Sequence, residues 1–192
     1  MNSAGACFET LRVEAGRVMH LRWHQARLDR TCRASGWPRY DLAALLSPPP
    51  GEWRCRFVYH ANGFETAYLP LRTRRVETLK TVADETLEYA FKFTDRSRLD
   101  ALYERRGAAD DVLIVRHGLV TDTTIANVAF FIQGRWLTPD RPLLGGTTRA
   151  RLLDEGLLVE AEVTEKMARK AEKIAVMNAL SGFVEVGGGI LA

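Results

Sequence analysis

Tight turns between neighbouring apolar stretches are the feature of this sequence that most limits its fold. WRCRFVYH and FETAYLPL alternate apolar and polar residues on either side of a turn at residues 61–63, and similar stretches flank residues 117–118 and 133–134. Short turns of this kind join antiparallel strands, whereas parallel strands need a long crossover. The sequence therefore predicts a mixed α+β (α/β) fold and argues against a doubly wound parallel sheet.

The expected helices and strands fall into two lobes. Helical spacing of apolar residues predicts helices at 23–36, 40–47, 94–107, 148–156 and within 163–180. Thr94 or Asp95 is expected to cap the third of these helices. A polar segment at 83–87 then divides a small α/β lobe, residues 1–85, from a strand-rich lobe, residues 86–192.

Composition limits the class of protein. With 192 residues the chain can bury the core of one domain or of two small lobes. The net charge is +3 and the basic residues are scattered, so we expect no nucleic-acid partner. No apolar run approaches the roughly 20 residues that span a bilayer. The opening MNSAGACFETLRV lacks the basic and apolar regions of a signal peptide. We therefore expect a cytoplasmic protein without a membrane partner.

The cysteines and histidines give no pattern for a metal site. Cys7, Cys32 and Cys55 are odd in number and far apart, so neither a disulfide framework nor a CxxC site follows. His20 and His24 have the spacing of a helical metal pair, but the sequence has no HExxH motif and no carboxylate close to them. We expect no metal.

Lys92 is the most unusual cation of the chain, because it lies between Phe91 and Phe93 in EYAFKFTDRSRLD. The sequence has 22 arginines and only 5 lysines, and the other lysines lie in polar segments. A lysine withdrawn from water can lose its proton and act as a nucleophile, whereas arginine stays charged. Lys92, which the pattern places on an aromatic strand, is therefore either a Schiff-base lysine or an edge-strand lysine whose ammonium reaches water.

A glycine- and threonine-rich loop, PLLGGTTRARLLDEG, opens directly into a predicted helix. Inward-turned backbone N–H groups and a helix N-terminus favour anions, and the hydroxyls of Thr147 and Thr148 would add donors. The loop does not match the P-loop, because GK[ST] is absent. It is either a phosphate cup or an ordinary loop in which one of the two threonines caps the helix.

Three more side chains are candidates for the same chemistry. Asp122 follows a hairpin turn and Asn127 begins an apolar strand. Asp122 is either a turn aspartate that binds its own backbone or a carboxylate held against a ring nitrogen. Arg27, on the apolar side of its helix, is either a phosphate ligand or a surface salt-bridge partner. A Schiff-base lysine, a carboxylate and a phosphate cup with an arginine are together what pyridoxal phosphate requires.

Five elements occur in one order: FETLRV with HQARL, Lys92 with Arg96, GLVTDTTIAN, LGGTTR and MNAL. With them the chain resembles the class IV (fold-type IV) pyridoxal-phosphate enzymes, which include branched-chain and D-amino-acid aminotransferases and aminodeoxychorismate lyase. The resemblance implies a two-lobed homodimer with a pseudo-barrel C-terminal lobe and a small-molecule amino substrate. It implies that Lys92 carries the Schiff base.

The same resemblance assigns the remaining site residues. It places Arg27, Thr147 and Thr148 on the phosphate. It places Asp122 at the pyridine nitrogen, and it places Asn127, the end of the same element, among the cofactor-binding residues. It also implies that Asn178 and Ala179 of MNAL line the cofactor site.

The chain also departs from the family pattern. Asp122 stands where the family has a glutamate, and the family's usual segment ahead of FET is missing. Ser97 stands where many aminotransferases of the family have a tyrosine, and the lyase branch lacks that tyrosine as well. The resemblance therefore favours 4-amino-4-deoxychorismate lyase, a folate-biosynthesis activity that eliminates pyruvate and gives 4-aminobenzoate. The alternatives are an amino-acid transaminase of the branched-chain or D-amino-acid type and an inactive protein that binds the cofactor.

Overall fold

A computed structural model describes residues 5–192, which form two compact units. The first unit extends to Thr73 and also takes in the short segment Phe91–Asp95. The second unit consists of Arg74–Ala90 and Arg96–Ala192. The polar segment at 83–87 lies inside the second unit, and the lobe boundary expected there stays a prediction.

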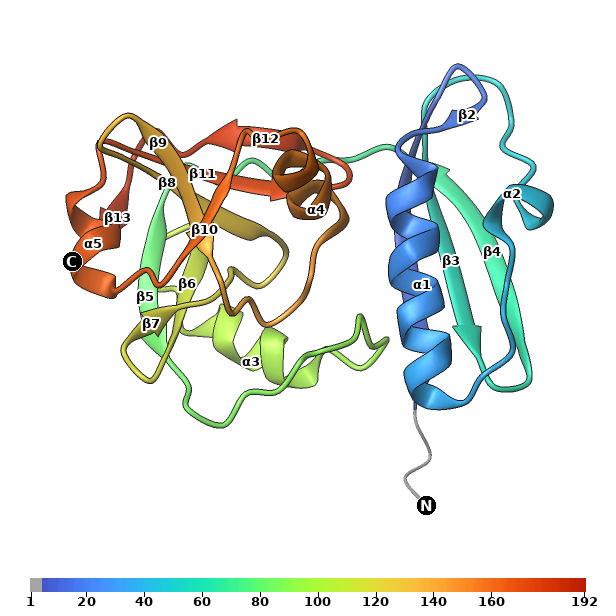
Figure 1. Cartoon of the computed structure of the whole chain (residues 1–192), viewed down its shortest axis with the longest axis horizontal. Helices are drawn as coiled ribbons and strands as arrows, with labels where there is room; N and C mark the ends of the chain where they lie inside the picture. Colours follow the sequence, from blue (N-terminus) through green and yellow to red (C-terminus); the bar gives the residue numbers. More distant parts are fainter. Residues whose placement is uncertain (1–4) are drawn as a thin grey trace. The chain divides into compact units, whose positions relative to one another are not determined.

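The first unit is a four-stranded antiparallel sheet with two helices (Figure 1). In chain order its elements are β1 (Cys7–Glu14), β2 (Arg17–Val18), α1 (Leu21–Ser35), α2 (Leu42–Leu45), β3 (Trp53–His60) and β4 (Gly63–Pro70). The strands lie in the order β2-β1-β3-β4. The predicted hairpin at 61–63 is confirmed, because β3 and β4 pair from Trp53 opposite Pro70 to His60 opposite Gly63.

Alternation along β1 decides which face of this sheet is covered. Cys7, Leu11 and Val13 are fully buried and pack with Leu28 and Cys32 of α1. Because side chains alternate in a strand, Glu9 points to this same apolar face. The face therefore buries one charged residue among apolar ones.

The second unit contains two sheets and three helices. Its elements are β5 (Leu79–Ala83), α3 (Ser97–Glu104), β6 (Asp111–Arg116), β7 (Leu119–Val120), β8 (Asn127–Ile132), β9 (Arg135–Pro139), α4 (Thr147–Asp154), β10 (Val159–Ala161), α5 (Glu165–Lys170), β11 (Lys173–Asn178), β12 (Gly182–Glu185) and β13 (Ile190–Leu191). The sheet orders are β10-β9-β8-β11-β12 and β13-β5-β6-β7. Most neighbours are antiparallel, and the parallel pairs are β5 with β6, β5 with β13, and β9 with β10.

One apolar core joins the two sheets of the second unit. Leu79 and Leu113 come from the four-stranded sheet, and Val128, Phe130 and Val176 come from the five-stranded sheet. The hairpin turns predicted at 117–118 and 133–134 are both present with positive φ at each residue. These tight turns place β6 beside β7 and β8 beside β9, as the sequence pattern indicates.

Two predicted elements are wrong in detail. The helix expected at 94–107 begins at Ser97, after Arg96, and neither Thr94 nor Asp95 caps it. Lys92 is not in a strand: the segment around it is irregular, with a single bridge between Phe93 and Cys7. Aromatic residues favour strands, but here the backbone contacts of the segment decide its conformation.

Candidate functional site

The segment that carries Lys92 is tied to the beginning of β1. The Phe8 amide donates to the Lys92 carbonyl oxygen at 2.9 Å, and the Thr94 amide donates to the Ala6 carbonyl oxygen at 2.8 Å. The Phe93 amide donates to the carbonyl oxygen of Phe91 at 2.9 Å, which makes the turn at Lys92 tight. Hydrogen bonds of Lys92 itself and of the residues before and after it therefore fix the backbone at this position.

The Lys92 side chain is half-buried and lies near aromatic rings. Its Nζ is 4.9 Å from the centre of the Phe8 ring, a distance typical of a cation–π contact. Phe91 and Phe93 are packed edge to face beside it, with ring centres 5.9 Å apart. The ammonium group is therefore set among apolar groups on a fixed turn, and its role as a Schiff-base lysine stays a prediction.

Glu9, His24 and Arg27 form a buried polar cluster in the first unit. Glu9 Oε1 accepts a hydrogen bond from Arg27 Nε at 2.8 Å, and Oε2 accepts one from Arg27 Nη2 at 2.6 Å. His24 Nδ1 lies 2.6 Å from Glu9 Oε2. The three residues are 0%, 1% and 6% exposed in that order. A two-point contact with a carboxylate fixes the plane of the Arg27 guanidinium.

The charges in this cluster follow from burial and contact. Burial raises the pKa of Glu9, but the charge of Arg27 and the hydrogen bonds from His24 and Arg27 outweigh it and lower the pKa to about 2. Burial lowers the pKa of His24, and the charges of Arg27 and Lys92 lower it further, against the raising effect of Glu9. An ionised carboxylate only accepts, so His24 is neutral and carries its proton on Nδ1.

This cluster corrects two statements made from the sequence. His24 does have a carboxylate beside it, because the fold brings Glu9 of β1 against α1. Arg27 is not a surface salt-bridge partner, because its side chain is buried against Glu9. The sequence signal that was missed is Glu9 itself, a charged residue at an inward position between Cys7 and Leu11.

Asp122 and Asn127 meet in the second unit, at the beginning of β8. Asn127 Nδ2 donates to Asp122 Oδ1 at 2.6 Å, and the Leu144 amide donates to Asp122 Oδ2 at 2.9 Å. Asn127 Nδ2 also donates to the Leu144 carbonyl oxygen at 2.8 Å. Asp122 is thus not a turn aspartate bonded to its own backbone. It links the beginning of β8 to the loop ahead of α4.

Burial dominates the ionisation of Asp122. The residue is 4% exposed, and burial raises the pKa of its carboxyl to about 7 although Leu144, Asn127 and the charge of Arg149 act to lower it. The groups that donate to it, Asn127 and the backbone of Leu144 and Leu143, are neutral, and within residues 5–192 it makes no ion pair. A buried carboxyl of this kind would be stabilised as an anion by a cation placed against it.

The loop before α4 packs tightly against Asn127. A side chain on Gly146 would place its Cβ 1.8 Å from Asn127 Oδ1, so only glycine fits there. Gly146 is also the N-cap of α4 and supplies no side-chain cap, and Thr147 is the first helical residue. The prediction that a threonine caps the helix is therefore wrong. Thr147 and Thr148 are buried at a helix N-terminus, where anions are favoured.

Asn178 and Ala179 lie at the end of β11 and in the turn after it. Asn178 Oδ1 accepts from the amides of Leu180 and Ser181, at 3.0 and 2.9 Å, so this side chain stabilises the turn to β12. Met177 pairs with Asn127 in the sheet, which puts Asn178 at the same sheet end as Asn127. The structure therefore gathers Asp122, Asn127 and Asn178 in the second unit, while Arg27 and Lys92 belong to the first unit.

These side chains fit the chemistry of pyridoxal phosphate, which has a ring nitrogen, a phosphate and an aldehyde. A protonated ring nitrogen is a cation, and Asp122 is a buried carboxyl without an ion pair in the described part of the chain. The uncapped N-terminus of α4 with Thr147 suits a phosphate. Lys92 supplies an amine, the group with which an aldehyde forms a covalent bond.

Residues 86–187 match the sequence model of the family Amino-transferase class IV. A relative from Haemophilus influenzae, named only as an uncharacterized protein, is 34% identical over 183 residues, which cover 91% of this chain and 97% of the relative. The chain belongs to the class IV amino-transferases.

Two solved structures extend this comparison. The crystal structure of a "putative 4-amino-4-deoxychorismate lyase" from Haemophilus somnus is 31% identical, with a TM-score of 0.85, and covers 93% of this chain and 97% of that chain. A PLP-bound hypothetical aminotransferase from Mycobacterium tuberculosis is 19% identical, with a TM-score of 0.80, and covers 95% of this chain and 80% of that chain. The similarity confirms the predicted α+β fold of the fold-type IV enzymes.

Two structural findings concern metal ions and membranes. Over residues 5–192 no group of three or more histidines, cysteines, aspartates or glutamates is placed to hold a metal ion. No helix in this described part of the chain is long and apolar enough to cross a membrane.

Proposed function

We propose that this chain is a pyridoxal-phosphate enzyme of the lyase branch, which eliminates pyruvate from 4-amino-4-deoxychorismate and gives 4-aminobenzoate. The observation that carries the proposal is Asp122, a buried carboxyl with a pKa raised to about 7 and no ion pair among the described residues. Burying an unpaired carboxylate destabilises the folded protein, and a cation that binds to the carboxylate offsets this loss of free energy.

Pyridoxal phosphate is the cofactor that the family and the similar structures, one of them PLP-bound, indicate. When bound, it withdraws electrons from the substrate carbon next to the amino group. Asp122 holds the proton on the pyridine nitrogen, and Asn127 orients the Asp122 carboxylate through its 2.6 Å hydrogen bond. Thr147, Thr148 and Arg27 bind the phosphate, and Asn178 and Ala179 line the site.

Lys92 is the catalytic residue of the proposal. Its amine would hold the cofactor through the aldehyde, and as a free amine it would take up and release protons as a base and an acid. The Phe8 ring, whose centre is 4.9 Å from Nζ, and the hydrogen bonds of the Lys92 backbone to β1 position this amine.

The choice of reaction depends on residues beside Lys92 and on one relative. Arg96 and Ser97 follow the lyase pattern, and the Haemophilus somnus structure named as a putative lyase is 31% identical to this chain. The proposal includes the cytoplasmic location, the role in folate biosynthesis and the homodimer that are usual for such enzymes. Its substrate is a small amino compound.

A reduction experiment tests the proposed role of Lys92. The purified protein is incubated with pyridoxal phosphate, its absorbance is recorded between about 300 and 500 nm, and borohydride is added before the cofactor is located by peptide mass. We expect the cofactor fixed on Lys92 in the wild type and in Lys80→Ala, and no fixed cofactor in Lys92→Ala. Lys80 is a suitable control because it is a half-buried lysine of β5.

The outcomes separate the candidate functions. Pyruvate released from 4-amino-4-deoxychorismate supports the lyase, whereas a keto acid formed from an amino-acid donor identifies a transaminase. Fixed cofactor without turnover of either kind identifies an inactive cofactor-binding protein. No fixed cofactor in the wild type would overturn the whole proposal.

A further inference from the structure

The loop that carries Asp122, residues 121–126, is buried although four consecutive residues in it are polar. Thr121, Asp122, Thr123 and Thr124 are each 5% exposed or less. Thr121 Oγ1 donates to the Ile114 carbonyl oxygen at 3.1 Å, and Thr123 Oγ1 accepts from the Ala126 amide at 3.0 Å. Buried polar groups need such partners, so specific hydrogen bonds fix the loop in addition to the apolar packing of Ile125 and Ala126.

Thr124 is the residue that connects this loop to charged groups. Its Oγ1 donates to Asp111 Oδ1 at 2.7 Å, and its carbonyl oxygen accepts from Arg96 Nη2 at 2.9 Å. Hydrogen bonds to charged partners are stronger than those between neutral groups. Thr124 is thus held at both its side chain and its backbone, two residues after Asp122.

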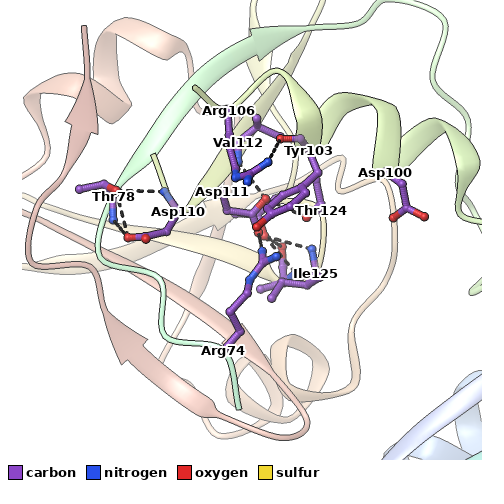
Figure 2. A network of polar contacts seen from close by, with 12 residues as sticks. Arg74, Thr78, Asp100, Tyr103, Arg106, Asp110, Asp111, Val112, Thr124 and Ile125 are labelled. Carbon is purple, nitrogen blue, oxygen red and sulfur yellow. Dashed lines mark hydrogen bonds and ion pairs between the residues drawn. The ribbon is translucent and has the colours of Figure 1, made fainter. Parts of the chain in front are cut away.

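Asp111 lies at the centre of this arrangement (Figure 2). It is the first residue of β6 and is completely buried. Besides Thr124, its Oδ1 accepts from the Val112 amide at 2.8 Å, and its Oδ2 pairs with the guanidinium of Arg74. Arg74 in turn lies over the Tyr103 ring, with its Cζ 4.6 Å from the ring centre. The carboxylate of Asp111 is therefore satisfied and held in one orientation.

The short side chain of Asp122 makes its backbone position important. An aspartate reaches its target through two rotatable bonds, so a displaced backbone displaces the carboxylate with it. The Ile114 amide donates to the Asp122 carbonyl oxygen at 2.8 Å, which fixes one end of the loop on β6. Asp111 and Thr124 fix the other end on the same strand.

We propose that Asp111 is a positioning residue, which acts through Thr124 to hold the Asp122 carboxylate where a protonated ring nitrogen binds. The inference rests on the proposed function, because it needs Asp122 to face that nitrogen. Asp111 touches neither cofactor nor substrate. Asp111 affects how strongly Asp122 prefers a cationic ring. Residues that hydrogen-bond to metal ligands have the same kind of effect, because they orient the ligands.

The test compares binding of pyridoxal phosphate with binding of its 1-deaza analogue, which has carbon in place of the ring nitrogen. Equilibrium dissociation constants of both compounds are measured with purified protein, so no turnover is needed. We expect Asp111→Asn and Thr124→Val to reduce the preference for pyridoxal phosphate by about tenfold, as lost orienting partners do elsewhere. Thr124→Ser keeps the hydroxyl and should retain the wild-type preference.

Asp110→Asn is the matched control. Asp110 precedes Asp111 and accepts hydrogen bonds from the Glu77 and Thr78 amides, both at 2.9 Å, and from Thr78 Oγ1 at 3.0 Å. These partners lie outside the 121–126 loop, as Figure 2 shows. If Asp110→Asn only loosens the fold, it should weaken the binding of both compounds equally. The ratio of their two dissociation constants should then stay as in the wild type.

The outcomes distinguish this inference from the proposed function. A wild type that binds the two compounds equally well would contradict the role of Asp122 at the ring nitrogen, and the inference about Asp111 falls with it. A wild type that prefers pyridoxal phosphate, with Thr124→Val and Asp111→Asn keeping the full preference, would overturn only the role of Asp111. A reduced preference in Thr124→Val, with Thr124→Ser and Asp110→Asn unchanged, supports it.

Discussion

The two units each bury a carboxyl group, but with opposite consequences for ionisation. Glu9 in the first unit has a pKa lowered to about 2, and Asp122 in the second has a pKa raised to about 7. Both are almost inaccessible, at 0% and 4% exposed. Burial raises the pKa of both. The difference must therefore come from what each carboxyl touches.

The partners explain the difference. Glu9 is paired with the guanidinium of Arg27 through two hydrogen bonds, and the charge of Arg27 together with the hydrogen bonds from Arg27 and His24 outweighs the effect of burial on its pKa. Asp122 receives neutral donors, the amide of Leu144 and the side chain of Asn127, and a backbone hydrogen bond from Leu143 also lowers its pKa. The cationic partner of Glu9 is a residue of the first unit, Arg27, whereas a bound ligand can provide the cationic partner of Asp122. A buried carboxyl with a strongly raised pKa and no cationic partner in the described residues is a candidate for function.

The largest effect is expected from Glu9→Gln. The change leaves the charge of Arg27 buried without its carboxylate, and breaking a buried pair in this way costs about 3–5 kcal/mol. The free energy of unfolding in urea measures this cost. Glu14→Gln is the control, because Glu14 pairs with Arg12 near the surface and such pairs contribute about 1 kcal/mol or less. Equal losses in the two variants would show that the buried cluster does not stabilise the fold.

The second largest effect is the dependence of the free energy of unfolding on pH that Asp122 produces. Its pKa rises from 3.8 to about 7 on folding, so the folded state retains a proton that the unfolded state loses. The stabilisation is complete below pH 3.8 and is lost as the pH rises through about 7. In that window the free energy of unfolding falls by at most about 1.4 kcal/mol per pH unit.

Asp122→Asn isolates this term in the cofactor-free protein, because asparagine does not titrate. We expect the variant to gain stability relative to the wild type as the pH rises from about 5 to about 7. Urea unfolding of both proteins at several pH values measures the difference, and the other groups cancel. A difference that stays constant with pH would mean that Asp122 is ionised across the range, and the contrast with Glu9 would disappear.

The comparison also shows what could be predicted from the sequence. The hairpins follow from local alternation and turn residues, and His117 with Gly118 adopts the positive φ that such a turn needs. Asp122, Asn127 and the loop of Thr147 were found because each belongs to a short motif. Local patterns thus gave the strands and the positions of the candidate residues.

The buried partners could not be predicted in this way. Glu9 meets His24 only because α1 packs on β1, and Asp111 meets Arg74 only because the second unit folds around β6. These contacts depend on tertiary packing, which no local pattern encodes. The irregular backbone at Lys92 has the same origin, since hydrogen bonds to β1 override the strand preference of its aromatic neighbours.

The smallest effect concerns Arg149, a cation that acts on Asp122 from a distance. Arg149 in α4 is 7% exposed and donates to Glu160 at 2.6 Å and to the Pro139 carbonyl oxygen at 2.7 Å, and its charge lowers the pKa of Asp122 without contact. Arg149→Met removes that charge, so we expect the pKa of Asp122 to rise above about 7.

The carboxyl carbon resonance of Asp122, followed by NMR as a function of pH, measures the shift. Arg151→Met is the control, because Arg151 lies in the same helix and pairs with Glu155 at 2.9 Å. An unchanged titration in Arg149→Met would mean that the charge of Arg149 does not act on Asp122, and that burial and the hydrogen bonds of the carboxyl set its pKa. A rise would show that α4 already supplies part of the positive potential at Asp122, to which a bound ring nitrogen would add. Asp122 would then be intermediate between a buried carboxyl that receives no positive charge from the protein and Glu9, which is fully paired with Arg27.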